Sequence, residues 1–196
     1  MRILFAAFLL IGALTSCSID REIKDLSDIE KLAFEQFQGL PERNKLKLVA
    51  DKEPGQKLHI CGTLKIEKDS IIIPRKEILV YHANAMGLYE ETIPGEESTA
   101  RINGRVFADD VGRFYIETIM PGDYPNRKDN RHIHTLVKDA KPEAYDIHFR
   151  QYTDYLASEF IRGSEQHFNA TLKQNEKGEL VIFVDLVVQK LKKKKD

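Results

Sequence analysis

The stretch RINGRVFADDVGRFYIET, residues 101–118, places two short alternating runs of polar and apolar residues on either side of a turn signal. Alternation with a period of two is typical of β-strands, because successive side chains point to opposite faces of a sheet. The two aspartates and the glycine between Asp109 and Gly112 favour a tight turn. We therefore predict strands at residues 101–108 and 113–118.

The same pattern continues through most of the chain. Short runs rich in β-branched and aromatic residues recur from Leu58 onward, separated by turn signals such as Pro94-Gly95 and Pro121-Gly122. Many short strands at this spacing predict an all-β chain, folded as an antiparallel β-sandwich of the immunoglobulin or prealbumin type. The further strands are predicted near residues 58–67, 70–73, 77–83, 131–137, 145–150, 168–172 and 180–188.

Residues 21–38 follow a different rule, because their apolar residues recur every three or four positions. This spacing predicts an amphipathic helix, which Gly39 and Pro41 end, so the sandwich has a short N-terminal helical arm. The apolar positions are Ile23, Leu26, Ile29, Ala33 and Phe37. The expected organisation is a signal segment at 1–16, a tether and helix at 17–50, the sandwich at 51–190 and a basic tail at 191–196.

The chain begins MRILFAAFLLIGALTSC, one arginine followed by an apolar run. This is the layout of a secretory signal, and the run is too short to span a bilayer. Its last residues, Leu14 to Cys17, resemble the lipobox of bacterial lipoproteins, which implies cleavage before Cys17 and lipidation of its thiol. We expect a lipid-anchored protein of the bacterial cell envelope, with an ordinary signal and an incidental cysteine as the alternative.

The charge balance does not favour nucleic acid as a partner. The chain has 30 Lys+Arg against 31 Asp+Glu, and this balance gives no support to nucleic-acid binding. If Cys17 is lipidated, Cys61 is the only other cysteine, so no intrachain disulfide can form. An exported domain of this kind must be stabilised by core burial, by metal ligation or by both.

The stretch DYPNRKDNRHIH, residues 123–134, contains a candidate metal site. His132 and His134 are two apart in a predicted strand, so they point the same way, and imidazole suits iron, zinc and copper. The pair alone is no more typical of a metal site than of a solvated strand face. Tyr124 and Tyr89 make iron more specific, since a phenol of pKa about 10 loses its proton only to a strong Lewis acid such as ferric iron.

Four motifs in sequence order resemble the catalytic domain of the intradiol ring-cleavage dioxygenases, such as protocatechuate 3,4-dioxygenase and catechol 1,2-dioxygenase. The resemblance covers residues 58–154. Its motifs are Gly-x-Tyr at 87–89, the turn at Ala108-Asp109 with Gly112, Pro-Gly-x-Tyr-Pro at 121–125 and His-Ile-His at 132–134.

The resemblance implies a function as well as a fold. It implies one non-haem ferric ion, Fe(3+), held by Tyr89, Tyr124, His132 and His134, with Tyr124 leaving the ion when a catechol binds. The reaction implied is ring cleavage of a catechol-type diol by dioxygen, giving a cis,cis-muconate-type product without an organic cofactor. Members of the family are often oligomeric, so a homo-oligomer is also expected, with the helix before Gly39 available for its interface.

The sequence departs from the family pattern near the substrate. The family places an arginine three residues before the first histidine, where this chain has Asp129. Arg131 would face away from His132 in a regular strand, so we assign Arg127 as the catalytic arginine. Asp146 also stands where the family has a glutamine.

Two alternatives to the enzyme stay open: a non-catalytic β-sandwich lipoprotein resembling transthyretin-like binding modules, and an iron-binding protein without turnover. The remaining histidines fall in or beside predicted strands, where we interpret each as hydrogen-bonded or partly exposed rather than as a ligand. They are His59, His82, His148 and His167.

Overall fold

The computed structural model describes residues 21–66 and 71–191. The signal-like segment, Cys17 and the lysines from Lys192 lie outside these residues. The described helices are α1 (Asp28–Gln38) and α2 (Tyr155–Arg162), with two 3-10 helices, η1 (Glu42–Asn44) and η2 (Glu97–Thr99). None of them is long and apolar enough to cross a membrane.

The strands follow the chain in this order: β1 (Lys24–Asp25), β2 (Lys45–Lys47), β3 (Lys57–Ile66), β4 (Ile71–Ile72), β5 (Glu77–Tyr81), β6 (Asn103–Phe107), β7 (Arg113–Ile119), β8 (Asn130–Val137), β9 (Ala140–Lys141), β10 (Ala144–Thr153), β11 (His167–Ala170), β12 (Lys173–Gln174), β13 (Leu180–Val188) and β14 (Lys190–Leu191).

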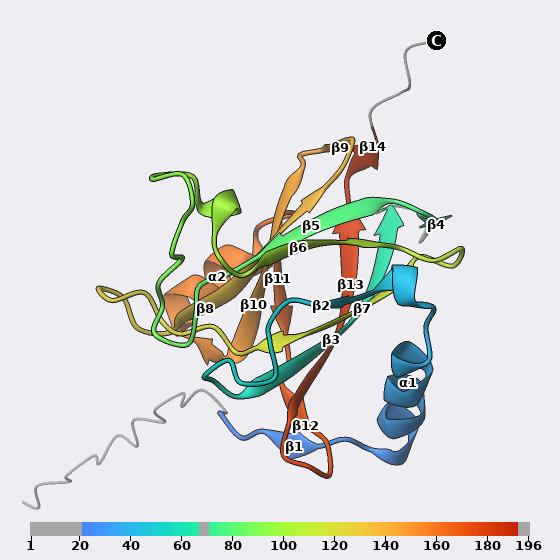
Figure 1. Cartoon of the computed structure of the whole chain (residues 1–196), viewed down its shortest axis with the longest axis horizontal. Helices are drawn as coiled ribbons and strands as arrows, with labels where there is room; N and C mark the ends of the chain where they lie inside the picture. The colour runs from blue at the N-terminus through green and yellow to red at the C-terminus, as the bar shows by residue number, and fades with distance from the viewer. Residues whose placement is uncertain (1–20, 67–70, 192–196) are drawn as a thin grey trace, which may run out of the picture.

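Two sheets packed face to face form the body of the protein (Figure 1). Within the described residues, the seven-stranded sheet has the order β1-β12-β13-β3-β7-β2 with β4 paired to β3, and the five-stranded sheet has the order β11-β10-β8-β5-β6. Alternate residues of both sheets, such as Ile60 of β3 and Ile133 of β8, are fully buried between them. The predicted all-β sandwich is confirmed.

In the part of the chain that the structure describes, four strand pairs are parallel, which the expectation of antiparallel pairing did not include. They are β1 with β12, β2 with β7, β3 with β13 and β10 with β11. The longest, β3 with β13, runs in register from Leu58 beside Leu180 to Ile66 beside Val188. Parallel strands tend to be covered on both faces, and the nearly unbroken apolar run LVIFVDLVV of β13 fits this environment.

The turn at residues 108–112 carries the chain from one sheet to the other. Strand β6 before it pairs with β5, whereas β7 after it pairs with β3. The Asp109 carboxylate accepts the backbone N–H groups of Val111 at 2.9 Å and Arg113 at 2.7 Å. These bonds close the turn on itself, as aspartate does in tight turns.

Helix α1 begins later than predicted, and its buried face is shifted from the predicted one. Ser27 caps it in a capping box with Glu30, so the residues before Ser27 are not helical. Phe34 is the buried helix residue and packs beside Cys61 and Val181, whereas Ile29 is 81% exposed. Leu26 is buried too, but it lies in an extended segment beside β1. Its apolar spacing therefore placed it in the predicted helix, although it is not helical.

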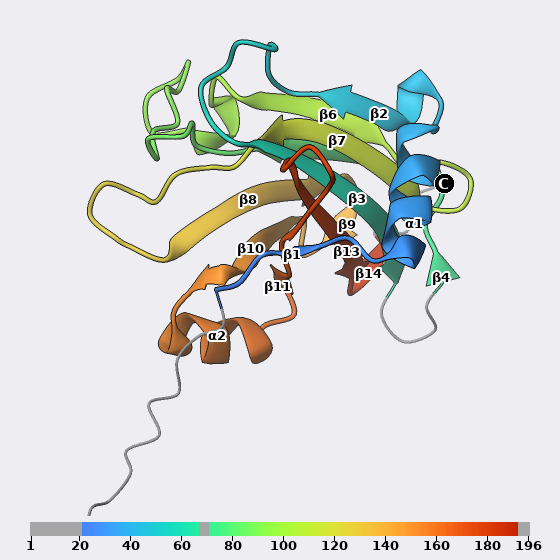
Figure 2. The same ribbon diagram turned by 90° about the horizontal axis from the view of Figure 1, so that it is seen from below.

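Helix α2 was not predicted. It follows β10 and lies against β10 and β11, on the side of the five-stranded sheet that faces away from the core (Figure 2). The Phe160 ring of this helix meets the His167 ring of β11 edge-on, with centroids 4.9 Å apart.

Two of the remaining histidines are buried hydrogen-bonding residues, as predicted. His82 follows β5, donates from Nδ1 to the Ala83 carbonyl at 2.7 Å and accepts at Nε2 from the Thr118 hydroxyl of β7, also at 2.7 Å. It therefore links the two sheets. His59 contacts the Tyr115 hydroxyl at 2.7 Å and Glu179 at 3.1 Å.

His82 makes stability depend on pH. Burial lowers the pKa of this fully buried imidazole from 6.5 to about 4, so between these values the unfolded chain binds a proton that the folded chain does not. We expect the free energy of unfolding to fall as the pH drops from 6.5 to about 4, and to be unaffected by His82 above that window. The free energy of unfolding, measured with urea across this pH range, should depend less steeply on pH in His82→Gln than in the wild type. Equal pH dependence in the two proteins would contradict the assignment.

Candidate metal centre

The His-x-His pair lies on the outer face of the five-stranded sheet. Along β8, Ile133 and Thr135 are buried toward the core, and His132 and His134 alternate with them and point the other way. His134 lies in register between Tyr81 of β5 and Asp146 of β10. A rigid central strand thus fixes the direction of both imidazoles.

Two loops bring the tyrosines over this face. Tyr89 follows β5 and Tyr124 follows β7, and the loops touch where each carries a glycine two residues before its tyrosine. A Cβ on Gly87, whose φ is +80°, would lie 1.8 Å from the Asp123 carbonyl oxygen. A Cβ on Gly122 would lie 2.4 Å from the Ala85 carbonyl oxygen.

The contact between the loops explains the glycine in each tyrosine motif. The Gly122 N–H donates to the Asn84 carbonyl at 2.9 Å, and the Asn84 side chain accepts the N–H groups of Met86 at 2.9 Å and Leu88 at 3.1 Å. No side chain fits between backbones this close. The tyrosines can meet only because both positions lack a Cβ.

Four side-chain atoms converge where the loops meet the strand. The Tyr89 hydroxyl lies 2.6 Å from that of Tyr124 and 2.8 Å from Nε2 of His134. The Tyr124 hydroxyl lies 3.2 Å from Nε2 of His132, and the two Nε2 atoms are 3.1 Å apart. All four side chains are partly buried.

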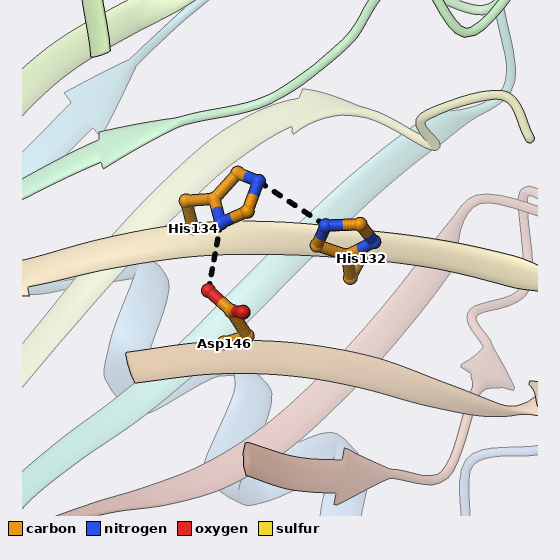
Figure 3. Close-up of side chains that lie close together, drawn as sticks. All are labelled: His132, His134 and Asp146. Atoms are coloured by element: carbon orange, nitrogen blue, oxygen red, sulfur yellow. Dashed lines mark hydrogen bonds and ion pairs between the residues drawn. The ribbon is translucent and has the colours of Figure 1, made fainter. Parts of the chain in front are cut away.

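Backbone and carboxylate acceptors fix the tautomer of each histidine. Nδ1 of His134 lies 2.7 Å from the Asp146 carboxylate (Figure 3), and Nδ1 of His132 lies 2.5 Å from the Asn130 carbonyl. Both acceptors take an N–H, so the hydrogens are assigned to Nδ1 and the Nε2 lone pairs face the tyrosines. Metal-bound histidines are oriented in the same way.

The cluster holds fewer protons than its contacts would need as hydrogen bonds. Two phenols supply one proton each and the Nε2 atoms supply none, yet the four atoms make four contacts of 2.6–3.2 Å. Two of these contacts therefore bring acceptor against acceptor, above all the facing Nε2 pair. A cation among the four atoms removes this conflict, because every one of them is then a ligand.

Burial favours the neutral forms of Tyr89, Tyr124 and His132. It raises the pKa of Tyr89, to which the bond with Tyr124 adds, and it raises the pKa of Tyr124. It lowers the pKa of His132, with the nearby His134 adding to the effect. The neutral His132 imidazole is thus ready to bind a metal, whereas the two phenols need a strong Lewis acid to ionise them.

A family model described as "Dioxygenase" matches residues 32–184, most of the chain. The chain belongs to the intradiol ring-cleavage dioxygenase family. It is therefore a member of a family of oxidoreductases that use non-haem iron, and the two phenol oxygens and two imidazole nitrogens fit such an ion. The separations of 2.6–3.2 Å among these four atoms leave them close enough together to hold one ion.

Solved structures of dioxygenases share the fold of this chain. The dioxygenase domain of a carbohydrate-binding fusion protein from Streptomyces sp. SirexAA-E aligns with a TM-score of 0.53 and 19% identity, over 73% of this chain and 86% of that one. An intradiol ring-cleavage dioxygenase from Tetranychus urticae gives 0.53 and 16%, over 73% and 85%. The 3-chlorocatechol 1,2-dioxygenase of Rhodococcus opacus 1CP gives 0.56 and 15%, over 78% and 66%. A search of curated protein sequences gave no match.

Among the described residues, neither Arg127 nor Arg131 makes a side-chain hydrogen bond or ion pair with the four-atom cluster. Arg127 lies on the Tyr124 loop with an exposed side chain, and among the described residues no hydrogen bond or ion pair joins its guanidinium to the four-atom cluster. Its catalytic role stays a prediction. Arg131 pairs with Asp123 at 3.3 Å and stacks over Tyr152 at 4.0 Å.

Asp129, which replaces the family arginine, has a structural partner. Both of its carboxylate oxygens accept from Arg21, at 2.8 Å each, so the segment before β1 is joined to the Tyr124 loop. Asp129 has a positive φ of 55°, a conformation that aspartate tolerates better than most residues.

Sequence reasoning named Asp146 only as a departure from the family pattern, and it missed the contacts that polar residues make around the cluster. Asp146 holds His134, and Glu97 of η2 places a carboxylate oxygen 3.6 Å from His134 Nε2. His148 stacks on His132 with ring centroids 5.1 Å apart, and its Nε2 lies 3.0 Å from Nδ1 of His167. The interpretation of His148 and His167 as hydrogen-bonded is confirmed. Both residues also adjoin the cluster, and only the sheet register could reveal this.

Proposed function

We propose that this protein binds one ferric ion through Tyr89, Tyr124, His132 and His134 and cleaves a catechol-type diol between its two hydroxyl groups. Dioxygen supplies both added oxygen atoms, and the product is a cis,cis-muconate-type diacid. The observation that carries the proposal is the closed set of four donor atoms with too few protons to satisfy one another. The bound ion would supply the Lewis acidity that ionises phenols and the redox chemistry that engages dioxygen.

The proposed ligands come from two kinds of element, a strand and the loops beside it. His132 and His134 are fixed on β8 and oriented through Nδ1, so they suit a permanent hold on the ion. Tyr124 lies on a loop whose two ends are joined by side chains. The Tyr124 N–H donates to the Asn130 side-chain oxygen at 3.1 Å, and the Asn130 N–H donates to the Asp123 carboxylate at 3.2 Å. A loop ligand can move aside without disturbing the sheet.

Tyr124 therefore fits the role of the base. Its pKa is raised by burial, so its ionised oxygen takes a proton readily once a catechol replaces it. The proton would come from a catechol hydroxyl and rest on Tyr124 Oη, which the adjacent Tyr89 Oη, 2.6 Å away, can stabilise. Tyr124 thus accepts one of the two catechol protons, and a hydroxide ion would have to accept the other for the diol to bind in its doubly ionised form.

The test is a visible spectrum of the ferric-loaded protein before and after addition of catechol without dioxygen. We expect a tyrosinate-to-iron charge-transfer band that shifts with catechol, and equimolar uptake of dioxygen once it is admitted. Tyr124→Phe should keep a weaker band from Tyr89 and lose most turnover. A protein that takes up no iron and shows no band would overturn the proposal, and a band without dioxygen uptake would reduce it to iron binding.

A further inference from the structure

A second group of metal-binding side chains adjoins the four-residue cluster. It consists of Asp146 and His148 of β10 and His167 of β11, whose nearest ligand atoms all lie within 4.8 Å of one another. Nε2 of His148 and Nδ1 of His167 are 3.0 Å apart, and the second carboxylate oxygen of Asp146 lies 3.7 Å from the same His167 atom. None of these residues belongs to the proposed iron ligands.

The sheet register creates this group. Asp146 lies in register with His134 on one side and His167 on the other, and His148 lies in register with His132. All five side chains thus share the outer face of the sheet in two adjacent rows. Strands about 4.8 Å apart bring such cross-strand neighbours within reach of one ion.

We propose that Asp146, His148 and His167 bind a divalent cation of the zinc type beside the iron site. Two imidazoles and one carboxylate are a donor set that borderline metals such as Zn²⁺ prefer, with coordination positions left open. A cation would replace the single proton shared by His148 and His167. It would also engage the Asp146 oxygen, which is too far from His167 for a hydrogen bond.

Other groups on this face leave the three donors available. His132 only stacks on the His148 ring, and its Nδ1 and Nε2 are committed to Asn130 and to the four-atom cluster. The Asp146 oxygen that meets His134 is a different atom from the one facing His167. His167 and Asp146 are each 22% exposed at the side chain, so a cation can reach them from solvent.

Asp146 would couple the two metals, an effect that rests on the proposed function. One of its oxygens holds His134 Nδ1 at 2.7 Å and the other faces the second site. A cation on that second oxygen withdraws charge from the carboxylate, which then accepts less strongly from His134. His134 becomes a weaker donor to iron, and the ferric charge-transfer band should move to longer wavelength.

Zinc titration of the iron-loaded full chain, followed by metal analysis after dialysis, tests the site. We expect one zinc per chain in addition to iron, with the iron retained and its band shifted. His148→Asn and His167→Asn should each weaken zinc binding more than about 100-fold, because even loss of an outer partner costs about 10–100-fold. Asn169→Ala is the matched control, since Asn169 lies on β11 in register with His148 and is exposed.

The outcomes separate the second site from the iron site. If the chain takes up no iron but binds zinc in a way that depends on His148 and His167, the second site is supported and the proposed function is overturned. Zinc binding that survives both histidine substitutions, or no zinc beyond the iron site, would overturn the second site. A bound zinc that leaves the ferric band unmoved would overturn the coupling through Asp146.

Discussion

Replacement of His132 by alanine is expected to abolish iron loading while the sandwich stays folded. His132 is a strand-borne donor of the cluster, and its loss leaves three donor residues and an opening in the outer face of β8. Loss of a partner that only orients a ligand already costs about 10–100-fold in metal affinity, so loss of the ligand should cost more than about 100-fold. The hydrophobic core lies on the opposite face of the strand and keeps its contacts.

Iron content after loading and dialysis, with urea unfolding of the same samples, measures both parts of this expectation. Leu136→Ala is the matched control, because Leu136 lies further along the same strand on the same face and carries no metal donor. The control should retain iron and its charge-transfer band. Wild-type iron occupancy in His132→Ala would show that the cluster is not the iron site.

Replacement of Gly87 by alanine should separate the two tyrosine loops. The added Cβ would lie 1.8 Å from the Asp123 carbonyl oxygen, which belongs to backbone and cannot rotate away. The positive φ of Gly87 adds a cost of roughly 1–2 kcal/mol, and overpacking typically adds about 1–3 kcal/mol. Because Asp123 directly precedes Tyr124, the loop must shift, and we expect the iron band to weaken together with stability.

Gly95→Ala isolates the contribution of the clash. Gly95 lies on the same loop as Gly87 with a φ of +83°, but an added Cβ would meet nothing within 4 Å. Gly95→Ala should therefore lower the free energy of unfolding only by the cost of the positive φ, and it should leave the iron band unchanged. Equal losses of stability and iron in the two variants would mean that the loop contact does not position the tyrosines.

Much of the architecture was determined by local pattern. Alternation located most of the long strands within a few residues, and the spacing of His132 and His134 put both on one face because side chains alternate along any strand. The glycines two residues before Tyr89 and Tyr124 were visible as motifs, although nothing local showed that each makes room for the other loop.

The tertiary structure decided which strands are neighbours. Local pattern fixes the face on which a side chain lies, but the pairing of distant strands depends on how the whole core closes. The turn at 108–112 changes sheets, and β10 pairs with β8 on one edge and β11 on the other. This register places Asp146 behind His134 and brings His148 and His167 beside the proposed iron site. No spacing in the sequence could reveal this, because the residues come from three separate strands.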